Sequence, residues 1–351
     1  MKNNTLHNNF KLNGKHFDSE NDLLHFVKNH LKHVYIFLSE WFDDSDFVTV
    51  STSGSTGKPK KIQLKKEFMV NSAKATGDYF DLNKNTRALI CLPVEFIAGK
   101  MMLVRSMVLG WDVDLINSDA NPLKGIKKNY DFSAMVPLQL YNSLEQIDRI
   151  KKLIIGGGEV SVDLQSKIKE LPTKIFATYG MTETITHIAV KPLNSAAGFI
   201  QEKDYFQTLD KVVIRKDNRG CLVINAPKVT DEIIITNDLV EIISKDQFKW
   251  LGRYDHIINS GGIKLIPEQI EQKLSKIVKQ RFFVAGNPDD MLGEKLILIV
   301  EGEIQEDLAS QIYKLKTLNK YEVPKNIYSI EHFAETKTKK IQRQKTLELL
   351  L

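Results

Sequence analysis

Short apolar segments that recur between residues 88 and 157 limit the folds open to this chain of 351 residues more than any other feature. Each segment is five or six residues long, which suits a buried strand better than a buried helix. Helical material separates them, including an apolar stretch at 98–109. Apolar strands that alternate with helices are typical of an α/β fold with a mostly parallel sheet. The segments are ALICLP (88–93), DVDLI (112–116), SAMVP (133–137) and KLIIGG (152–157).

The pattern changes near residue 210 to short strands joined by hairpin-like turns, as in KVVIRKDNRGCLVINAP and DEIIITNDLVEII. This pattern predicts an antiparallel sheet region. A smaller mixture follows, with helices expected at 267–280 and 305–318 and further strands. We therefore predict a large N-terminal domain, 1–252, with the mostly parallel α/β sheet and the antiparallel region, and a small α+β domain, 253–351.

Composition narrows the range of partners. Lys plus Arg number 49 and Asp plus Glu 44, and no recognition-helix or RNA-binding pattern accompanies this mild surplus, so we expect no nucleic-acid partner. No apolar run approaches the roughly 18 residues of a membrane span. The polar N-terminus also lacks the apolar core of a signal peptide, so we expect a cytoplasmic protein. Cys91 and Cys221 lie in apolar, strand-like runs and are expected as buried, reduced thiols.

A loop rich in glycine and hydroxyl groups, STSGSTGKPK, follows one helix expected at 18–32 and a short strand at 47–50. Its glycines let backbone N–H groups approach oxyanions closely, which indicates a phosphate-binding loop; a flexible linker is the alternative. The spacing does not fit the Walker pattern. Pro59 places the loop between two strands, since KIQL at 61–64 also reads as a strand. The candidate phosphate-contact residues are Ser51, Thr52, Ser53, Gly54, Ser55, Thr56, Gly57 and Lys58.

Two later segments carry further groups suited to a nucleotide. ATYGMTET at 177–184 offers the flat ring of Tyr179, the hydroxyl of Thr182 and the carboxylate of Glu183. A carboxylate beside phosphate oxygens is the usual way to hold Mg²⁺, although in such a segment taken alone Glu183 would more often be a residue that starts a helix. ITNDL places Asp238 after a strand, where its carboxylate can accept both hydroxyls of a ribose.

Two final segments complete the set. LGRYDHIINSGGIKLIPEQIE contains Arg253, Asp255 and a Gly-Gly turn, and ETKTKKIQR contains Lys340. Together and in this order, the five segments resemble the motifs of the acyl- and aryl-CoA synthetase superfamily of adenylate-forming enzymes. The resemblance covers residues from about 47 to 345.

The resemblance implies that ATP activates a carboxylic acid as an acyl-adenylate, and that coenzyme A then displaces AMP to form a thioester. Mg²⁺ would assist the first step. By similarity, the phosphate loop holds the β- and γ-phosphates, and Lys340 bridges the carboxylate and the α-phosphate. Asp255 is the hinge about which the C-terminal domain swings. The remaining nucleotide contacts would come from Tyr179, Gly180, Met181, Thr182 and Glu183, with Glu183 also holding the metal, and from Asp238 and Arg253 at the ribose.

Three departures from the family pattern stand out. Lys339 and Ala334 occupy positions where the lysine motif usually has Gly and Pro, so Lys339 is a competitor of Lys340. The LPxxH run appears as LPVEF, which makes Phe96 the gate residue. The phosphate loop also comes unusually early. We therefore expect a trimmed N-terminal region, with part of the acyl-pocket wall absent or supplied by a partner chain, and leave a homo-oligomer open.

Among stand-alone members, the chain most resembles the o-succinylbenzoate-CoA ligases of menaquinone synthesis, in segments such as AGKMMLVRSM and LIIGGGEVS. That acid keeps a second carboxylate, which calls for a cation near the acyl pocket. Lys100 and Arg105 are the candidates, with a surface position for Arg105 as the alternative. Two alternatives remain open. The protein could be a synthetase for another aryl acid or a fatty acid, or a non-catalytic nucleotide-binding protein. The candidate substrate residues are Phe96, Lys100, Arg105, Gly156, Gly157, Gly158 and His187.

Overall fold

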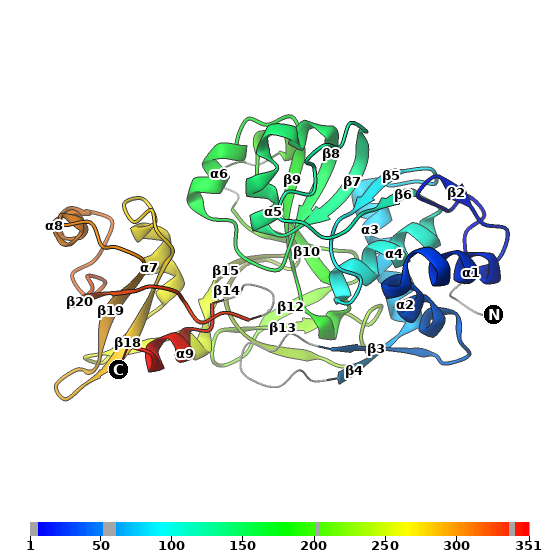
Figure 1. Ribbon diagram of the computed structural model, residues 1–351. Coiled ribbons are helices and arrows are strands. Elements are labelled where there is room, and N and C mark those ends of the chain that lie inside the picture. Colours follow the sequence, from blue (N-terminus) through cyan, green and yellow to red (C-terminus); the bar gives the residue numbers. More distant parts are fainter. Residues whose placement is uncertain (1–5, 52–60, 199, 201–203, 337–340, 351) are drawn as a thin grey trace.

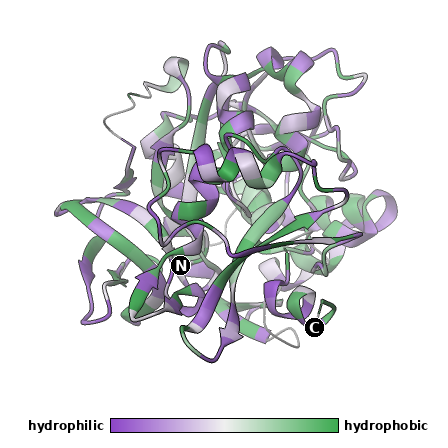
Figure 2. Cartoon of the chain, turned by 90° about the vertical axis from the view of Figure 1, so that its left-hand side faces the viewer, coloured by the Kyte–Doolittle hydropathy of each residue, from purple (hydrophilic) through white to green (hydrophobic). Residues whose placement is uncertain are grey.

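The computed structural model describes residues 6–51, 61–198, 200, 204–336 and 341–350 (Figure 1). A mixed sheet of 13 strands forms the larger unit, in the order β12-β13-β14-β15-β11-β10-β9-β8-β7-β5-β6-β1-β2. A second sheet of five strands, β16 to β20, forms the smaller unit. Figure 2 shows apolar residues along the central strands and polar residues in the outer loops. The predicted α/β fold class is confirmed.

The parallel half of the large sheet contains the apolar segments seen in the sequence. Strands β6, β5, β7, β8 and β9 pair in parallel, and β1 joins β6 in parallel while β2 forms an antiparallel edge. Their bounds are β1 (Lys11–Leu12), β2 (Lys15–His16), β5 (Arg87–Ile90), β6 (Asp112–Leu115), β7 (Tyr130–Met135), β8 (Ile150–Ile155) and β9 (Lys174–Gly180).

Helices cover both faces of this parallel half. Ala88 and Ile90 of β5 join a core with helices α3 and α4, whereas Leu89 between them joins a second core with α5 and α6. This alternation follows from the two-residue period of a strand, so the near-continuous apolar composition has a direct structural cause. The helices are α3 (Lys66–Phe80), α4 (Ile97–Leu109), α5 (Pro137–Asn142), η1 (Leu144–Arg149) and α6 (Val162–Ile168).

Strand direction reverses between β9 and β10, and from there every pair in the large sheet is antiparallel. The predicted antiparallel region is therefore an extension of the same sheet. Its strands are β10 (His187–Pro192), β11 (Phe206–Thr208), β12 (Val213–Lys216), β13 (Cys221–Asn225), β14 (Ile234–Ser244) and β15 (Gln247–Arg253). Short 3-10 turns, η2 (Thr182–Thr184) and η3 (Ser195–Ala197), flank β10.

The N-terminal part differs from the expected single helix at 18–32. Helix α1 (Glu20–His30) has Ser19 as its N-cap, and a second helix, α2 (Lys32–Phe42), follows directly. Helix α2 was missed although its buried residues recur at helical spacing. Strands β3 (Phe47–Ser51) and β4 (Lys61–Lys65) form an antiparallel pair, which confirms the two strands expected beside the phosphate loop.

The smaller unit contains β16 (Ile258–Ser260), β17 (Ile263–Leu265), β18 (Phe282–Asp289), β19 (Gly293–Glu301) and β20 (Asn326–Ile330). Its helices are α7 (Pro267–Leu274), α8 (Leu308–Lys314) and α9 (Arg343–Glu348). Helix α7 is shorter than the predicted 267–280, and after Leu274 the chain continues as a turn in which the Ile277 amide donates to the Leu274 carbonyl at 2.9 Å. Helix α8 is likewise shorter than 305–318.

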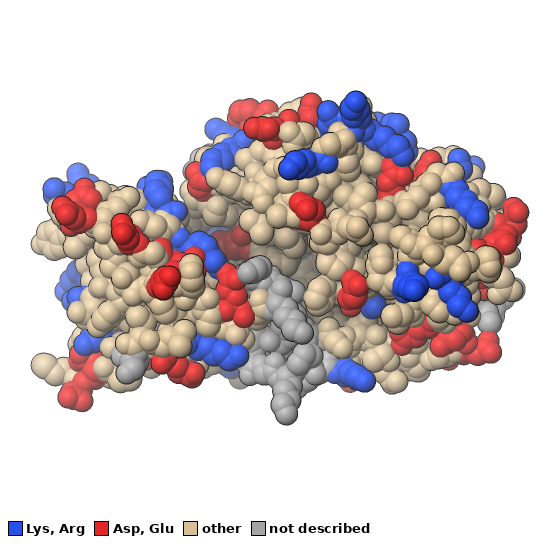
Figure 3. All heavy atoms as spheres, viewed as in Figure 1, with Lys and Arg blue, Asp and Glu red and all other residues tan. Residues whose placement is uncertain are grey.

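The sheets change between Arg253, the last residue of β15, and Ile258, the first of β16, with the turn η5 (Tyr254–His256) between them. The division into domains at 252–253 stays a prediction, and this change of sheet supports it. Figure 3 shows acidic and basic side chains interspersed on one face, which is hollowed where the two units meet. None of the helices in the described ranges is long and apolar enough to cross a membrane.

Cys91 and Cys221 are both buried and unpaired by disulfide, which confirms the expectation for them. Burial raises the pKa of the Cys91 thiol to about 12. That thiol therefore stays protonated at neutral pH and unreactive.

Helix α2 offers a test of the fold. Leu38 is fully buried in the core, whereas Ile36 on the same helix is 74% exposed. We expect Leu38→Ala to lower the free energy of unfolding by about 2–5 kcal/mol, because it leaves a cavity in a close-packed core. Ile36→Ala, the matched control, should change it by less than about 0.5 kcal/mol. Urea unfolding followed by circular dichroism measures both, and equal small effects would contradict the buried position of α2.

Candidate nucleotide and acyl site

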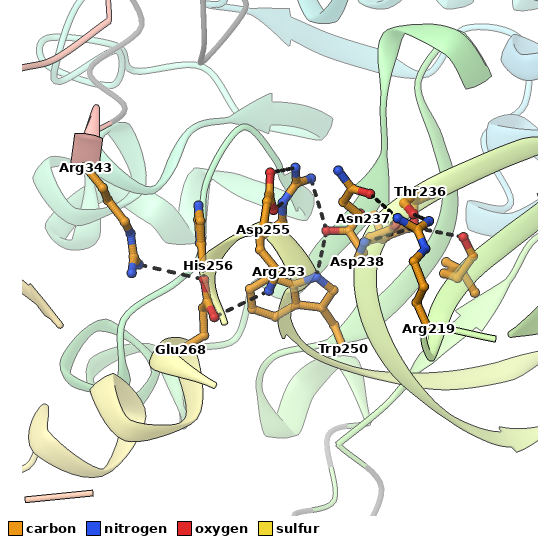
Figure 4. A network of polar contacts seen from close by, with 12 residues as sticks. Arg219, Thr236, Asn237, Asp238, Trp250, Arg253, Asp255, His256, Glu268 and Arg343 are labelled. Atoms are coloured by element: carbon orange, nitrogen blue, oxygen red, sulfur yellow. Dashed lines mark hydrogen bonds and ion pairs between the residues drawn. The ribbon is translucent and has the colours of Figure 1, made fainter. Parts of the chain in front are cut away.

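The predicted adenine and ribose residues meet across three strands of the large sheet. The Tyr179 hydroxyl, at the end of β9, donates to Asp238 Oδ2 in β14 at 2.6 Å. Trp250 Nε1 of β15 donates to Asp238 Oδ1 at 3.2 Å, and Arg253 Nη1 lies 3.5 Å from the same oxygen. Figure 4 shows the side chains of Trp250 and Arg253 converging on the Asp238 carboxylate. The structure thus brings together residues that are far apart in the sequence.

Strand register explains part of this convergence. Asp238 and Arg253 are directly opposite each other in the antiparallel pair β14–β15, where facing side chains interact. Asp238 is buried and its backbone N–H donates to Thr236 Oγ1 at 3.0 Å. Burial and the Asp238 charge raise the pKa of Tyr179 well above its usual value, so Tyr179 remains a hydrogen-bond donor. Sequence reasoning assigned no role to Thr236, although it lies within the ITNDL segment, or to Trp250, which lies outside the five motif segments.

The turn between β9 and β10 places Thr182 and Glu183 where strand direction reverses. Gly180 is required there, because a Cβ at this position would lie 2.1 Å from the Thr186 carbonyl oxygen. Thr182 and Glu183 are both in the short turn η2, and Glu183 is solvent-exposed. Ligands of open α/β sheets commonly bind where the topology switches at the carboxyl ends of strands. The position is therefore suitable for a nucleotide phosphate.

The same turn contains a strained residue, Ile185. Its φ is +66° and ψ −63°, and the Thr186 amide donates to the Thr184 carbonyl at 2.7 Å. This geometry is a classic-type γ-turn, which is rare and strained, especially for a β-branched side chain. The Thr184 hydroxyl fixes the turn through bonds with backbone groups of Met181 and Thr186. Strain held in this way is common at functional sites.

The glycine run Gly156–Gly158 follows β8 and lies against the neighbouring strand. A Cβ at Gly156 would be 3.0 Å from Thr178 Oγ1, and Gly157 has a φ of +79°. Because β8 and β9 are parallel neighbours, their carboxyl ends share one edge of the sheet. The run is therefore close to the YGMTET segment, and its predicted contact with an acyl group stays a prediction.

Arg105 of α4 is buried, with 2% of its surface exposed, so the alternative of a surface position is wrong. Its Nε donates to Thr76 Oγ1 and its Nη2 to Thr186 Oγ1, each at 3.1 Å. The His187 ring contacts the same two hydroxyls, at 3.5 Å and 3.0 Å. Arg105 and His187 therefore share one polar cluster, and their contact with a substrate stays a prediction.

The Arg105 cluster has unusual electrostatics. Burial lowers the pKa of Arg105 to about 9, and burial together with the Arg105 charge lowers the pKa of His187 well below its usual value. No carboxylate in the described ranges forms an ion pair with Arg105. A buried cation held only by neutral hydroxyls is costly, and an anionic group would stabilise it.

Lys100 occupies the other side of α4 and does not join this cluster. Its Nζ lies 4.7 Å from the centre of the Phe37 ring of α2. Burial lowers the pKa of Lys100, while the nearby charges of Glu40 and Glu95 oppose that effect. Phe96 is the partly exposed N-cap of α4. The structure thus separates the two candidate cations, and only Arg105 approaches the β9–β10 turn.

The predicted hinge residue Asp255 pairs with Arg253, which is predicted to contact the ribose. Arg253 Nε and Nη2 donate to the two Asp255 carboxylate oxygens at 2.9 and 2.8 Å. Burial acts to raise the pKa of Asp255, but the Arg253 hydrogen bonds and charge outweigh it and lower the pKa. Arg253 therefore links the hinge directly to Asp238, a connection that the sequence did not reveal.

Several predicted residues lie outside the described ranges. Ser51 ends β3 and is described, and the segment that contains Lys340 is flanked by a bridge between Glu335 and Ile341. No group of three or more His, Cys, Asp or Glu that could hold a metal is found within the described ranges. The predicted site residues that lie outside the described ranges are Thr52, Ser53, Gly54, Ser55, Thr56, Gly57, Lys58 and Lys340.

Comparison with known proteins decides the family. The family model of AMP-binding enzymes matches residues 27–223, more than half of the chain. The chain belongs to the AMP-binding enzyme family. A solved structure from Dyadobacter fermentans, an acyl-CoA synthetase (AMP-forming)/AMP-acid ligase II-like protein, is 38% identical, with a TM-score of 0.60, and the match covers 91% of this chain and 94% of that one.

More distant relatives point the same way. A 2-succinylbenzoate–CoA ligase of Bacillus cereus is 26% identical over 89% of this chain and 72% of its own length. The o-succinylbenzoate CoA synthetase of Bacillus subtilis, solved with its acyl-adenylate intermediate, is 22% identical with a TM-score of 0.74. The match covers 84% of this chain and 68% of that one, and this likeness shows the fold. The predicted family, fold class and enzyme class, an AMP-forming acid–CoA ligase, are confirmed.

The Arg105 cluster makes the stability of the protein depend on pH. His187 has a lowered pKa in the native state, so below pH about 6.5 the unfolded state takes up a proton that the native state does not. The free energy of unfolding therefore has its full value with respect to this group above that pH, and it decreases as the pH falls below it. We expect a loss of about 1.4 kcal/mol at pH 5.5 relative to pH 7.5 from this group. Urea unfolding at the two pH values, for the unsubstituted protein and for His187→Gln, measures this loss as the difference between the two pH dependences. Parallel pH profiles of the free energy of unfolding would contradict the prediction.

Proposed function

We propose that the protein activates o-succinylbenzoate with ATP and transfers the acyl group to coenzyme A, as a step of menaquinone synthesis. A carboxylate oxygen of the acid attacks the α-phosphorus of ATP, and pyrophosphate leaves. The thiolate of coenzyme A then attacks the acyl carbonyl carbon, and AMP leaves. The family supports the adenylate chemistry, and the names of the curated relatives support this acid.

The residues at the β9–β10 turn and those of β14 and β15 around Asp238 suit the first step. Asp238 and Arg253 would orient the ribose, and Thr182 would bind the α-phosphate as charge develops on it. Glu183 is an exposed single carboxylate, which fits Mg²⁺ because this ion keeps most of its waters and binds few protein ligands. The metal would neutralise charge on the phosphates. Lys340 would bridge the attacking carboxylate and the α-phosphate.

The observation that carries the choice of acid is the buried guanidinium of Arg105. It donates to Thr186, two positions beyond Thr184 of η2, and has no carboxylate partner among the described residues. A free carboxylate of the substrate would provide the missing negative charge in a desolvated setting, where such pairing is strong. A monocarboxylic aryl or fatty acid would leave the guanidinium without a counter-charge.

An acid panel tests the proposal. The purified protein is incubated with ATP, Mg²⁺, coenzyme A and one acid at a time, and the thioester is detected by mass. We expect o-succinylbenzoate to exceed benzoate and medium-chain fatty acids in turnover. Turnover with one of those acids alone would assign another substrate, and binding of ATP without turnover of any acid would favour a non-catalytic homologue.

Arg105→Met separates the two candidate cations. We expect it to lower kcat/KM for o-succinylbenzoate by about 100-fold, because the second carboxylate loses its buried charged partner. Activity with an acid that lacks this carboxylate should fall much less. Lys100→Met is the matched control on the same helix and should have little effect, since Lys100 faces Phe37. A larger loss in Lys100→Met than in Arg105→Met would overturn the assignment.

Lys340→Ala tests the lysine motif. We expect acid-dependent exchange of pyrophosphate into ATP to fall by at least about 100-fold, since Lys340 would neutralise charge only during acid activation. Binding of ATP, measured by calorimetry, should largely survive. Lys339→Ala is the neighbouring control and should retain exchange. If Lys339→Ala abolished exchange and Lys340→Ala did not, the competing lysine would carry the role.

A further inference from the structure

Glu268, in the first turn of α7, lies at the junction between the two units. Its side chain is only 6% exposed. Its Oε1 lies 2.5 Å from His256 Nδ1, and its Oε2 accepts the backbone N–H of Arg253 at 3.4 Å. Arg343 Nη2 lies 3.9 Å from Oε1. One buried carboxylate therefore contacts the end of the large sheet, the turn after it and the first residue of α9.

The backbone of the large sheet is shaped to receive this carboxylate. Gly252 of β15 has a φ of +150°, and a Cβ there would lie 2.4 Å from Glu268 Oε2 and 2.6 Å from Ile266 Cγ2. Any larger residue at this position would push the carboxylate away. Gly252 also pairs with Leu239 in β14, next to Asp238. The contact between the units is therefore closely fitted and lies beside the ribose residues.

A continuous chain of polar contacts passes through Glu268. It runs from Asp238 to Arg253, from Arg253 to Glu268 and from Glu268 to Arg343, as Figure 4 shows. Arg343 is also held by Glu271 through two bonds of 2.7 and 2.8 Å. Since Arg343 lies three positions after Lys340, Glu268 connects the ribose residues with the segment that carries the lysine.

The charge on Glu268 is maintained. Burial acts to raise the pKa of Glu268, but the His256 hydrogen bond and the charges of Arg343 and His256 outweigh it and hold the pKa below its usual value. The group is thus ionised at neutral pH. An ionised carboxylate accepts stronger hydrogen bonds than a neutral one.

We propose that Glu268 is a positioning residue that holds the smaller unit in the arrangement needed for activation of the acid. The inference rests on the proposed function and on Asp255 as the hinge. The contacts of Glu268 with Gly252 and Arg253 cross that hinge. Its contacts with His256 and Arg343 stay within the smaller unit. A rotation about Asp255 for thioester formation would break only the first pair. Glu268 therefore favours the first step over the second.

The two half-reactions test this directly. For Glu268→Gln we expect acid-dependent pyrophosphate exchange to fall by about tenfold, and Glu268→Ala should lose more. Thioester formation from synthetic o-succinylbenzoyl-adenylate and coenzyme A should stay within about twofold. Glu322→Gln is the matched control, because Glu322 pairs with Lys273 inside the smaller unit and touches no hinge residue. Equal losses in both steps, or no loss in either, would overturn the proposal.

A distance measurement gives a readout that does not depend on catalysis. Because Cys91 and Cys221 are buried, spin labels can be attached at Ile36→Cys on α2 and Tyr313→Cys on α8, both highly exposed positions. Glu268→Gln should broaden or shift the distance distribution between the labels, and Glu322→Gln should not. An unchanged distribution in Glu268→Gln would overturn the positioning role. Absence of exchange in the unsubstituted protein, with the distance shift present, would instead contradict the proposed function alone.

Discussion

The reversal of strand direction between β9 and β10 is the constraint on which the rest of the site depends. Up to β9 the strands are parallel, so their carboxyl ends gather at one edge. After the reversal, β14 and β15 extend the same sheet and present Asp238 and Arg253 beside Tyr179. The turn that makes the reversal also carries Thr182 and Glu183. One change of topology therefore assembles residues from separate parts of the chain.

Much of this fold can be predicted from the sequence, because buried parallel strands are nearly all apolar and short. The strands at 88–93, 112–116, 133–137 and 152–157 appear at or close to those positions. The flanking strands of the phosphate loop also follow from composition. The helix expected at 18–32 ends close to the observed boundary at Leu31. Helix α2 was missed because it follows α1 directly, with no proline or glycine loop between them to mark the start of a second helix.

The site is less predictable, since it depends on pairings across strands. The motifs indicated Tyr179, Asp238 and Arg253, but not that the Asp238 carboxylate joins the other two. Trp250 contributes only because the register of β15 brings it to Asp238. Lys100 and Arg105 appear equivalent in the sequence, and the packing of α4 separates them, with Lys100 against Phe37 of α2 and Arg105 against Thr186 of the β9–β10 turn. Burial and register are properties of the assembled sheet.

The γ-turn at Ile185 has a consequence for ligand binding. Its conformation costs roughly 1–3 kcal/mol and persists because Thr184 and the buried Ile185 side chain hold it. The turn is therefore already formed before any nucleotide arrives. A ligand that binds a preorganised segment loses no affinity to ordering it. Affinity for the adenylate would then depend on the contacts themselves, and a variant that relaxed this turn would bind more weakly even with every contacting side chain unchanged.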